Sequence, residues 1–257
     1  MIEVNNLVRR FGDLAAVDDL SFRVADGEVF GFLGPNGAGK TTTVKVIVGM
    51  IAPTSGEVRL NGLTLLENEL EVKRQIGYVP ESCALYENLT GREHLEMICE
   101  LQHLPPDKID ARINRLLELI DLKKAAGQRI IAYSKGMKQK LLLAGALIHN
   151  PKLLILDEPF SGLDANAQSV FKELIREFVR DGRIVIFCSH ILEVVERVCT
   201  RLLIIDRGQK LAEGTTSDII AAHNVKSLGE AFNALTGATD IDNQAHDILD
   251  ALNGERD

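Results

Sequence analysis

The chain has 257 residues, of which 46% are hydrophobic, and a formal net charge of -8. This length allows one large domain or one domain with an added lobe, and the apolar fraction is sufficient for a real core. The negative charge argues against a protein that coats nucleic acid. The sequence shows no signal-peptide pattern and no apolar run long enough to cross a bilayer. The 4 cysteines form no C-x-x-C pair, which favours reduced thiols in a cytosolic protein.

Short apolar runs typical of buried strands occur on both sides of a helix-rich central part. They lie at 29–33, 58–60, 76–79, 153–156, 184–187 and 202–205. The dipeptide Asn61–Gly62 predicts a tight turn after the second run. A helix is expected at 170–178, ending near Gly182. Strands that alternate with helices in this way imply βαβ units and a mostly parallel sheet.

The pattern becomes helical between about 85 and 150. Thr90 and Glu93 have the spacing of a capping box, which predicts a helix start at that point. An amphipathic helix is expected over 109–120, and Ser134 is a candidate N-cap for a third helix that closes before Pro151. These residues therefore predict a helical lobe inserted into an α/β domain.

The chain changes character again after about residue 215. Apolar residues at 228–235 and at 248–252 predict two short helices joined by a polar link. We interpret the tail 216–257 as a decorative helical extension with a frayed, partly disordered end.

The segment from Gly34 to Thr42 reads GPNGAGKTT and fits the phosphate-binding pattern G-x-x-x-x-G-K-[ST]. Glycines let successive backbone N–H groups point at phosphate oxygens, Lys40 adds a compact positive charge, and the Thr41 hydroxyl is a ligand for Mg²⁺. A strand precedes the loop and helical spacing follows it, so the pattern predicts a nucleotide site. Its expected binding residues are Gly34, Pro35, Asn36, Gly37, Ala38, Gly39, Lys40, Thr41 and Thr42.

Polar side chains follow two of the predicted buried strands. Asp157 and Glu158 end the run at 153–156, where two carboxylates are unfavourable unless they meet a cation or a substrate. Parallel strands present their carboxyl ends to the ligand crevice. We expect Asp157 to bind Mg²⁺ and Glu158 to polarise the attacking water. His190 follows the run at 184–187 and is expected to donate a hydrogen bond to the γ-phosphate.

From about Ile2 to Gly214 the chain resembles the ATP-binding cassette family. Six segments match that family's motifs in the right order. They are Phe11 as the aromatic that stacks on adenine, GPNGAGKTT as Walker A, Tyr133–Gln139 as the signature, Leu153–Pro159 as Walker B, Ser161–Asp164 as the D-loop and His190 as the switch histidine.

The resemblance implies a P-loop NTPase fold with a RecA-like α/β core, an antiparallel β subdomain and an inserted α-helical subdomain at about 85–150, the cassette as a whole spanning 1–215. It implies Mg²⁺-dependent ATP hydrolysis in sites shared by two cassettes. Lys40 would bind phosphate, Glu158 would be the general base, His190 would sense the γ-phosphate, and Ser134, Gly136 and Asp164 would act on ATP held by the other subunit. It also implies a separate membrane permease that holds the chain at the inner face of the cell membrane.

Two positions depart from the usual family pattern. The signature reads Ser-Lys-Gly-Met, with Lys135 and Met137 where Gly and Gln are usual. Glu81 stands where the family usually has the Q-loop glutamine, so we expect it beside the metal. Both variants, and the segment 226–237, resemble exporter ATPases of the multidrug, antibiotic-resistance and sodium-efflux branch.

Other interpretations remain open from the residues alone. A cassette protein of this kind can act on ribosomes or DNA, although those usually carry two cassettes or a long coiled coil. A regulatory module with a dead site is disfavoured by the intact Lys40, Asp157, Glu158 and His190. Phe11 has the alternative of a core aromatic on an edge strand. The basic cluster Lys135, Lys138 and Lys140 is better explained as a solvated helix face, or as favourable charge near phosphate, than as a nucleic-acid patch.

Overall fold

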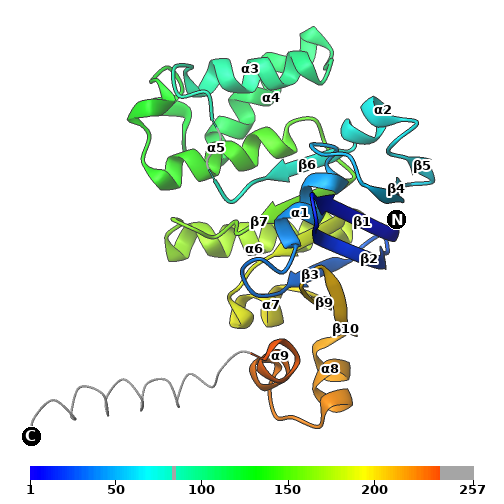
Figure 1. Ribbon diagram of the computed structural model, residues 1–257. Helices are drawn as coiled ribbons and strands as arrows, with labels where there is room; N and C mark the ends of the chain where they lie inside the picture. The colour runs from blue at the N-terminus through cyan, green and yellow to red at the C-terminus, as the bar shows by residue number, and fades with distance from the viewer. Residues whose placement is uncertain (83–84, 238–257) are drawn as a thin grey trace, which may run out of the picture.

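The computed structural model describes residues 1–82 and 85–237 (Figure 1). Within these residues a smaller antiparallel sheet has the strand order β2-β1-β4-β5, and a larger sheet has the order β10-β9-β3-β8-β7-β6. The smaller sheet consists of β1 (Ile2–Phe11), β2 (Leu14–Val24), β4 (Ser55–Leu60) and β5 (Leu63–Thr64).

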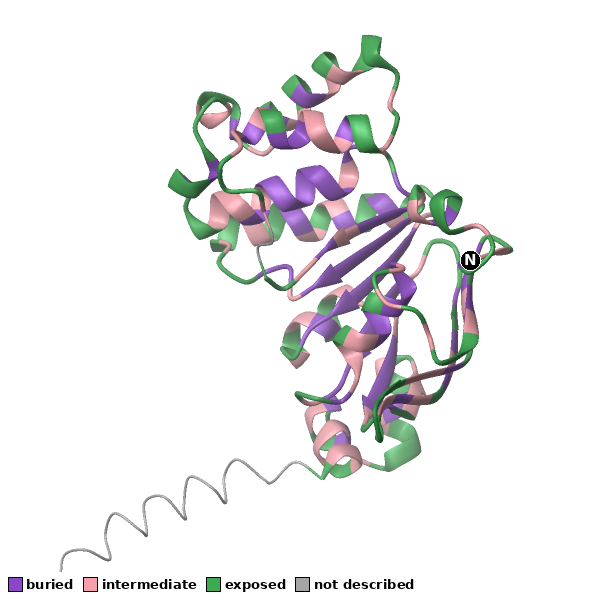
Figure 2. Cartoon of the chain, turned by 45° about the horizontal axis from the view of Figure 1, so that its top comes forward, coloured by how far each residue is buried: buried purple, intermediate pink, exposed green. Residues whose placement is uncertain are grey.

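The larger sheet carries the phosphate loop at the end of its third strand. Its strands are β3 (Val29–Leu33), β6 (Ile76–Val79), β7 (Leu153–Asp157), β8 (Ile184–Cys188), β9 (Arg201–Asp206) and β10 (Gln209–Gly214). Strands β6 to β9 and β3 pair in parallel, and β10 adds an antiparallel edge to β9. The strands β3, β7 and β8 are buried along their whole length, as expected for parallel strands covered on both faces (Figure 2).

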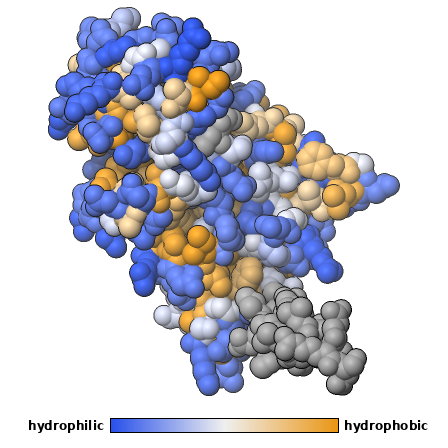
Figure 3. Space-filling model, turned by 90° about the vertical axis from the view of Figure 1, so that its left-hand side faces the viewer, coloured by the Kyte–Doolittle hydropathy of each residue, from blue (hydrophilic) through white to orange (hydrophobic). Residues whose placement is uncertain are grey.

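The helices divide into those that flank the sheets and those of a separate lobe. The first group is α1 (Lys40–Ile47), α2 (Glu69–Lys73), α6 (Ala165–Arg180), α7 (Leu192–Val198), α8 (Thr216–His223) and α9 (Leu228–Thr236). The lobe contains α3 (Gly91–Leu101), α4 (Pro106–Leu119), α5 (Lys135–Leu147) and short 3₁₀ turns at Lys123–Ala125 and Ile130–Ala132. Figure 1 shows the lobe above the sheets, and Figure 3 shows that its outer face is mostly hydrophilic.

Three apolar clusters hold these layers together. The first fills the space between the two sheets and includes Val44 and Ile47 of α1, which fixes the helix that follows the phosphate loop. The second covers the opposite face of the parallel sheet with side chains of α5, α6, α7 and the C-terminal helices. The third is the core of the helical lobe. The loops at the carboxyl ends of the strands are therefore held by packing on both faces of the sheet.

The predicted α/β fold is confirmed, with a P-loop core, an antiparallel sheet and inserted helices. The strands at 29–33 and 76–79 have the predicted limits, and Asn61 and Gly62 both have positive φ, as the predicted tight turn requires. The capping box of Thr90 and Glu93 is present with both of its hydrogen bonds. Ser134 caps α5 by accepting from the backbone N–H of Met137.

Two expectations about helices are wrong. The helix expected at 170–178 begins at Ala165, because the Asp164 side chain accepts from the backbone N–H of Ala167 and caps it. The tail is not decorative up to residue 237: Leu228 and Ala231 of α9 are fully buried in the second cluster. The expected helix at 248–252 lies outside the described residues. None of the helices in 1–82 and 85–237 has the length and apolar character that crossing a membrane requires.

Candidate nucleotide site

The phosphate loop leaves β3 and ends at Gly39, the N-cap of α1, whose φ of 104° is in the left-handed region. No side chain caps this helix, so the N–H groups of its first turn remain available to an anion. The Lys40 Nζ donates to the carbonyl oxygens of Gly34 and Pro35 at 2.6 and 3.0 Å, so the ammonium lies over the loop. The backbone is closely packed from behind: a Cβ on Gly39 would lie 2.4 Å from the Ala16 carbonyl oxygen.

A cavity of about 460 Å³ opens in front of this loop. It is lined by all nine residues of the loop, Gly34 to Thr42, together with Ala16, Glu81, Asp157, Glu158, His190 and Phe232. The structure thus brings the phosphate loop, both carboxylates of the β7 end, Glu81 and the histidine into one cavity, as the sequence predicted. As far as the described residues go, four predicted site residues do not line this cavity: Phe11, Ser134, Gly136 and Asp164.

Asp157 is buried at the end of β7, with 3% of its surface exposed. Its Oδ2 atom has no hydrogen-bond partner. The pKa of this carboxyl is raised from 3.8 to about 6, mainly by burial and then by the neighbouring carboxylates Glu81 and Glu158. Lys40 and Lys45 lower the pKa by less. A buried carboxylate that has an oxygen without a hydrogen-bond partner, and that lies beside two further carboxylates, favours the binding of a cation.

Replacing Asp157 by asparagine is expected to stabilise the nucleotide-free protein. A carboxyl whose pKa is raised in the folded state stabilises the fold at low pH and loses that contribution as pH rises from 3.8 through about 6. At pH 7.5 we expect Asp157→Asn to raise the free energy of unfolding by about 3 kcal/mol, from about 1.4 kcal/mol for each unit by which the pKa is raised. Urea denaturation at pH 7.5 and pH 4 measures this, and the gain should nearly vanish at the lower pH.

The matched control for that experiment is Asp181→Asn, since the Asp181 side chain is 69% exposed. It should change the free energy of unfolding by less than about 0.5 kcal/mol at either pH. Equal stabilities of the Asp157→Asn variant and the wild type at pH 7.5 would show that burial does not destabilise this carboxylate.

Glu158 follows directly and has a φ of 49°, which is uncommon for a residue other than glycine. Its Oε1 accepts from the His190 backbone N–H at 2.8 Å and lies 2.7 Å from His190 Nδ1. Its Oε2 accepts from the Ser189 hydroxyl at 3.1 Å. The carboxylate is therefore oriented by the segment after β8, while the His190 side chain remains 70% exposed toward the cavity.

Phe11 lies at the tip of the β1–β2 hairpin, with 48% of its surface exposed. The guanidinium carbon of Arg9 lies 4.4 Å from the centre of its ring, in cation–π geometry. The alternative that Phe11 is a core aromatic on an edge strand is wrong, because the ring is exposed and β1 lies between β2 and β4. An exposed ring held from one side can accept a planar ligand on the other.

Three residues of this site were not predicted from the sequence. Ala16 is part of the cavity through a bulge in β2, where the register with β1 shifts. Ser189 orients the Glu158 carboxylate. Its position directly before His190 in the sequence is the feature that could have identified it. Phe232 comes from α9 in the tail, and no local pattern connects it with a nucleotide.

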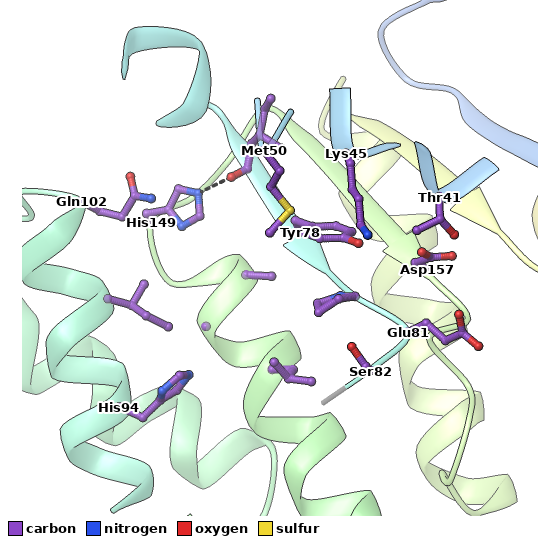
Figure 4. Close-up of a pocket in the computed structure, with 16 residues that line it drawn as sticks. Thr41, Lys45, Met50, Tyr78, Glu81, Ser82, His94, Gln102, His149 and Asp157 are labelled. Atoms are coloured by element: carbon purple, nitrogen blue, oxygen red, sulfur yellow. Dashed lines mark hydrogen bonds between the residues drawn. The ribbon is translucent and has the colours of Figure 1, made fainter. Parts of the chain in front are cut away.

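A second hollow of about 580 Å³ lies between the parallel sheet and the helical lobe (Figure 4). Thr41, Glu81 and Asp157 lie at one end of this groove, and Gln102 and His149 lie at the other. His149 Nε2 is 3.0 Å from the Ile76 carbonyl oxygen and so is the donor in that bond. The groove and the nucleotide cavity share the three residues at the first end.

A phosphate loop between a parallel strand and a helix, with a carboxylate pair at the end of β7 in the same sheet, defines a P-loop nucleoside triphosphatase. The chain belongs to the ABC transporter family, whose model matches residues 17–161, more than half of its length. It is an ATP-binding and ATP-hydrolysing member of that family.

Named relatives extend the similarity beyond the matched segment. The Nod factor export ATP-binding protein I of Paraburkholderia xenovorans (strain LB400) is 38% identical over 221 residues, which are 86% of this chain and 73% of that protein. The linearmycin resistance ATP-binding protein LnrL of Bacillus subtilis (strain 168) is 35% identical over 240 residues, 90% of this chain and 77% of that protein.

Solved structures agree with this placement. The ATP-binding subunit of an ABC transporter has a TM-score of 0.87 and 34% identity, covering 92% of this chain and 99% of its own. A dimeric ATP-binding cassette in a post-hydrolysis state, bound to ADP and Pi, has a TM-score of 0.76 at 23% identity, covering 84% and 98%, and shows a shared fold.

Proposed function

We propose that this chain energises a separate transmembrane permease, that the transporter is an exporter, and that the chain works at the inner face of the cell membrane. The observation that carries this proposal is the junction of the two hollows at Thr41, Glu81 and Asp157. A protein segment seated in the groove would contact the same three residues that face the nucleotide phosphates. ATP binding and hydrolysis would then directly change the contacts that the seated partner makes.

The residues at this junction fit Mg²⁺. The cation takes oxygen ligands, and Thr41 offers a hydroxyl while Asp157 and Glu81 offer carboxylates. In the described part of the chain, no group of three or more His, Cys, Asp or Glu side chains has the arrangement to hold a metal by itself. Mg²⁺ would therefore share its ligands with nucleotide phosphates and water, and when bound it would neutralise charge on the β- and γ-phosphates.

The remaining site residues take roles that match their geometry. Lys40, at the loop, would move from the carbonyls of Gly34 and Pro35 to the β- and γ-phosphates. Glu158 would accept the proton of the attacking water, because its carboxylate is aimed at the cavity by Ser189 and His190. The His190 ring, now against Glu158, would donate to the γ-phosphate, and Phe11 would stack on adenine.

A second cassette would complete each site. Ser134 and Gly136 open α5, and Ser134 and Asp164 are exposed on the chain's surface, outside its own nucleotide cavity. Helix N-termini bind anions, so the start of α5 is suited to the γ-phosphate of ATP held by another copy. The division into a cassette at 1–215 and a tail at 216–257 belongs to the same proposal.

The relatives favour export over the alternative of a machine acting on ribosomes or DNA. Their names describe Nod factor export and linearmycin resistance, and the similarity to them covers 86% and 90% of this chain. The Glu81 and Ser-Lys-Gly-Met variants point in the same direction. The cargo would be selected by the permease.

The groove can be tested with Met50→Glu. Met50 lines the groove and is 63% exposed, so a carboxylate there should leave the fold intact but disrupt an apolar contact with the permease (Figure 4). We expect permease-stimulated ATP hydrolysis in membrane vesicles to fall at least about tenfold, which corresponds to about 1.4 kcal/mol of lost binding. Hydrolysis by the isolated chain should remain within twofold of the wild type.

Leu66→Glu is the matched control, because Leu66 is 83% exposed and does not line the groove. It should retain full stimulation by the permease. If Met50→Glu also retains it, or if the wild type sediments with ribosomes and is not stimulated by any membrane partner, the transport proposal is wrong.

A further inference from the structure

The signature segment and the segment after Walker B are in contact within the same chain. Lys135 Nζ donates to the Ser161 hydroxyl at 2.8 Å, and its methylene groups cover Gly162, where a Cβ would lie 2.8 Å from Lys135 Cγ. One turn further along α5, the buried Gln139 donates its Nε2 to the Pro159 carbonyl oxygen at 3.0 Å. The start of α5 is thus tied to residues 159–162 at two points.

That segment is joined in turn to the carboxylate at the end of β7. The Ser161 backbone N–H donates to the Glu158 carbonyl oxygen at 3.2 Å and closes a turn. Glu158 has left-handed backbone angles, which persist only where the surrounding contacts impose them. A contact that holds Ser161 therefore also limits the orientations available to Glu158.

We propose that Lys135 is a positioning residue, which holds Ser161 so that the turn carrying Glu158 keeps its catalytic conformation. A glycine, the usual residue at this place in the family, has no side chain to make this contact. The inference rests on the proposed function, in which α5 of one copy meets ATP held by the other. Lys135 then links the nucleotide in one site to the general base of the other.

The geometry separates this role from direct phosphate binding. The Lys135 ammonium already has an acceptor in its own chain, and Ser161 reaches Glu158 through one backbone hydrogen bond. If Lys135 acts through Ser161, removal of either partner removes the same effect. If Lys135 instead binds the phosphate of the other copy's ATP, the two substitutions act independently.

The test is a double-mutant cycle on the full chain with Lys135→Met, Ser161→Ala and the combination. Lys135 and Ser161 are exposed, so all three variants should fold, which thermal unfolding checks. We expect each single variant to lower kcat about fivefold, with KM for ATP changed less than twofold and the Hill coefficient reduced toward one. The double variant should be no slower than either single variant. Lys135→Arg should restore most of the rate, and Lys140→Met on the same helix should match the wild type.

Three results would overturn the proposal. The first is an unchanged kcat in Lys135→Met, and the second is a KM for ATP that rises in Lys135→Met but not in Ser161→Ala. The third is a double variant whose loss of kcat is the product of the losses in the two single variants. Failure of the proposed function would look different. In that case the wild type itself would show no dimer with ATP and a Hill coefficient of one.

Discussion

Glu158→Gln should lower ATP turnover by at least about 100-fold, which is the lower range for the loss of a general base. Glutamine has the same shape: its oxygen can accept from the His190 backbone N–H, and its NH2 group can donate to the Ser189 hydroxyl oxygen in place of the bond that this hydroxyl donates to Glu158. It cannot accept the proton of the attacking water. ATP should bind as tightly as in the wild type, and the uncleaved nucleotide should hold two copies together, as gel filtration with ATP would show.

Glu173→Gln provides the control, because Glu173 is an exposed carboxylate on α6 paired with Arg176. Its turnover should equal that of the wild type. Turnover of Glu158→Gln within tenfold of the wild type would mean that another group takes the proton, and the assignment of Glu158 would be wrong.

Gly39→Ala should abolish ATP binding and lower the free energy of unfolding by more than about 2 kcal/mol. Two effects add at this position. The φ of 104° is unfavourable for any residue with a Cβ, and that Cβ would lie 2.4 Å from the Ala16 carbonyl oxygen, which is backbone and cannot rotate away. The loop would have to move relative to β2, and the backbone N–H groups at the start of α1 would no longer point at the phosphates. Calorimetric titration with ATP and urea denaturation measure the two effects.

Gly37→Ala separates the backbone strain of a positive φ from the steric clash of a new Cβ with neighbouring atoms. Gly37 has a φ of 82°, but a Cβ there has no neighbouring atom within 4 Å. It should lower the free energy of unfolding by only about 1 kcal/mol, the typical penalty of a left-handed residue with a side chain. Equal losses of stability in the two variants would show that the approach of Ala16 to the loop is unimportant.

The strands, the phosphate loop and the two carboxylates were predictable because each depends on neighbours in the sequence. An apolar run such as 153–156 and the glycines of 34–39 carry their own geometric requirements. The convergence of Asp157, Glu158 and His190 followed from one rule, that parallel strands open their carboxyl ends to the same crevice. That rule needed only the order of the elements.

The features that could not be predicted depend on contacts between distant segments. Ala16 reaches the loop through a bulge in β2, and nothing near Ala16 in the sequence marks it. The start of α6 was placed too late because a capping aspartate was assigned only to the D-loop. The contact of Lys135 with Ser161 joins residues 26 positions apart, and a motif comparison records the lysine only as a departure from the usual pattern.

The position of Phe232 has a practical consequence for where this protein can be cut. Its ring belongs to the wall of the nucleotide cavity, while Leu228 and Ala231 on the same helix are fully buried. A chain shortened after Thr215, at the end of the cassette segment 1–215, would lose a wall of its nucleotide cavity and expose apolar surface beside it. Rates measured on such a shortened chain would describe a different enzyme, so the last helices belong in any preparation used for kinetics.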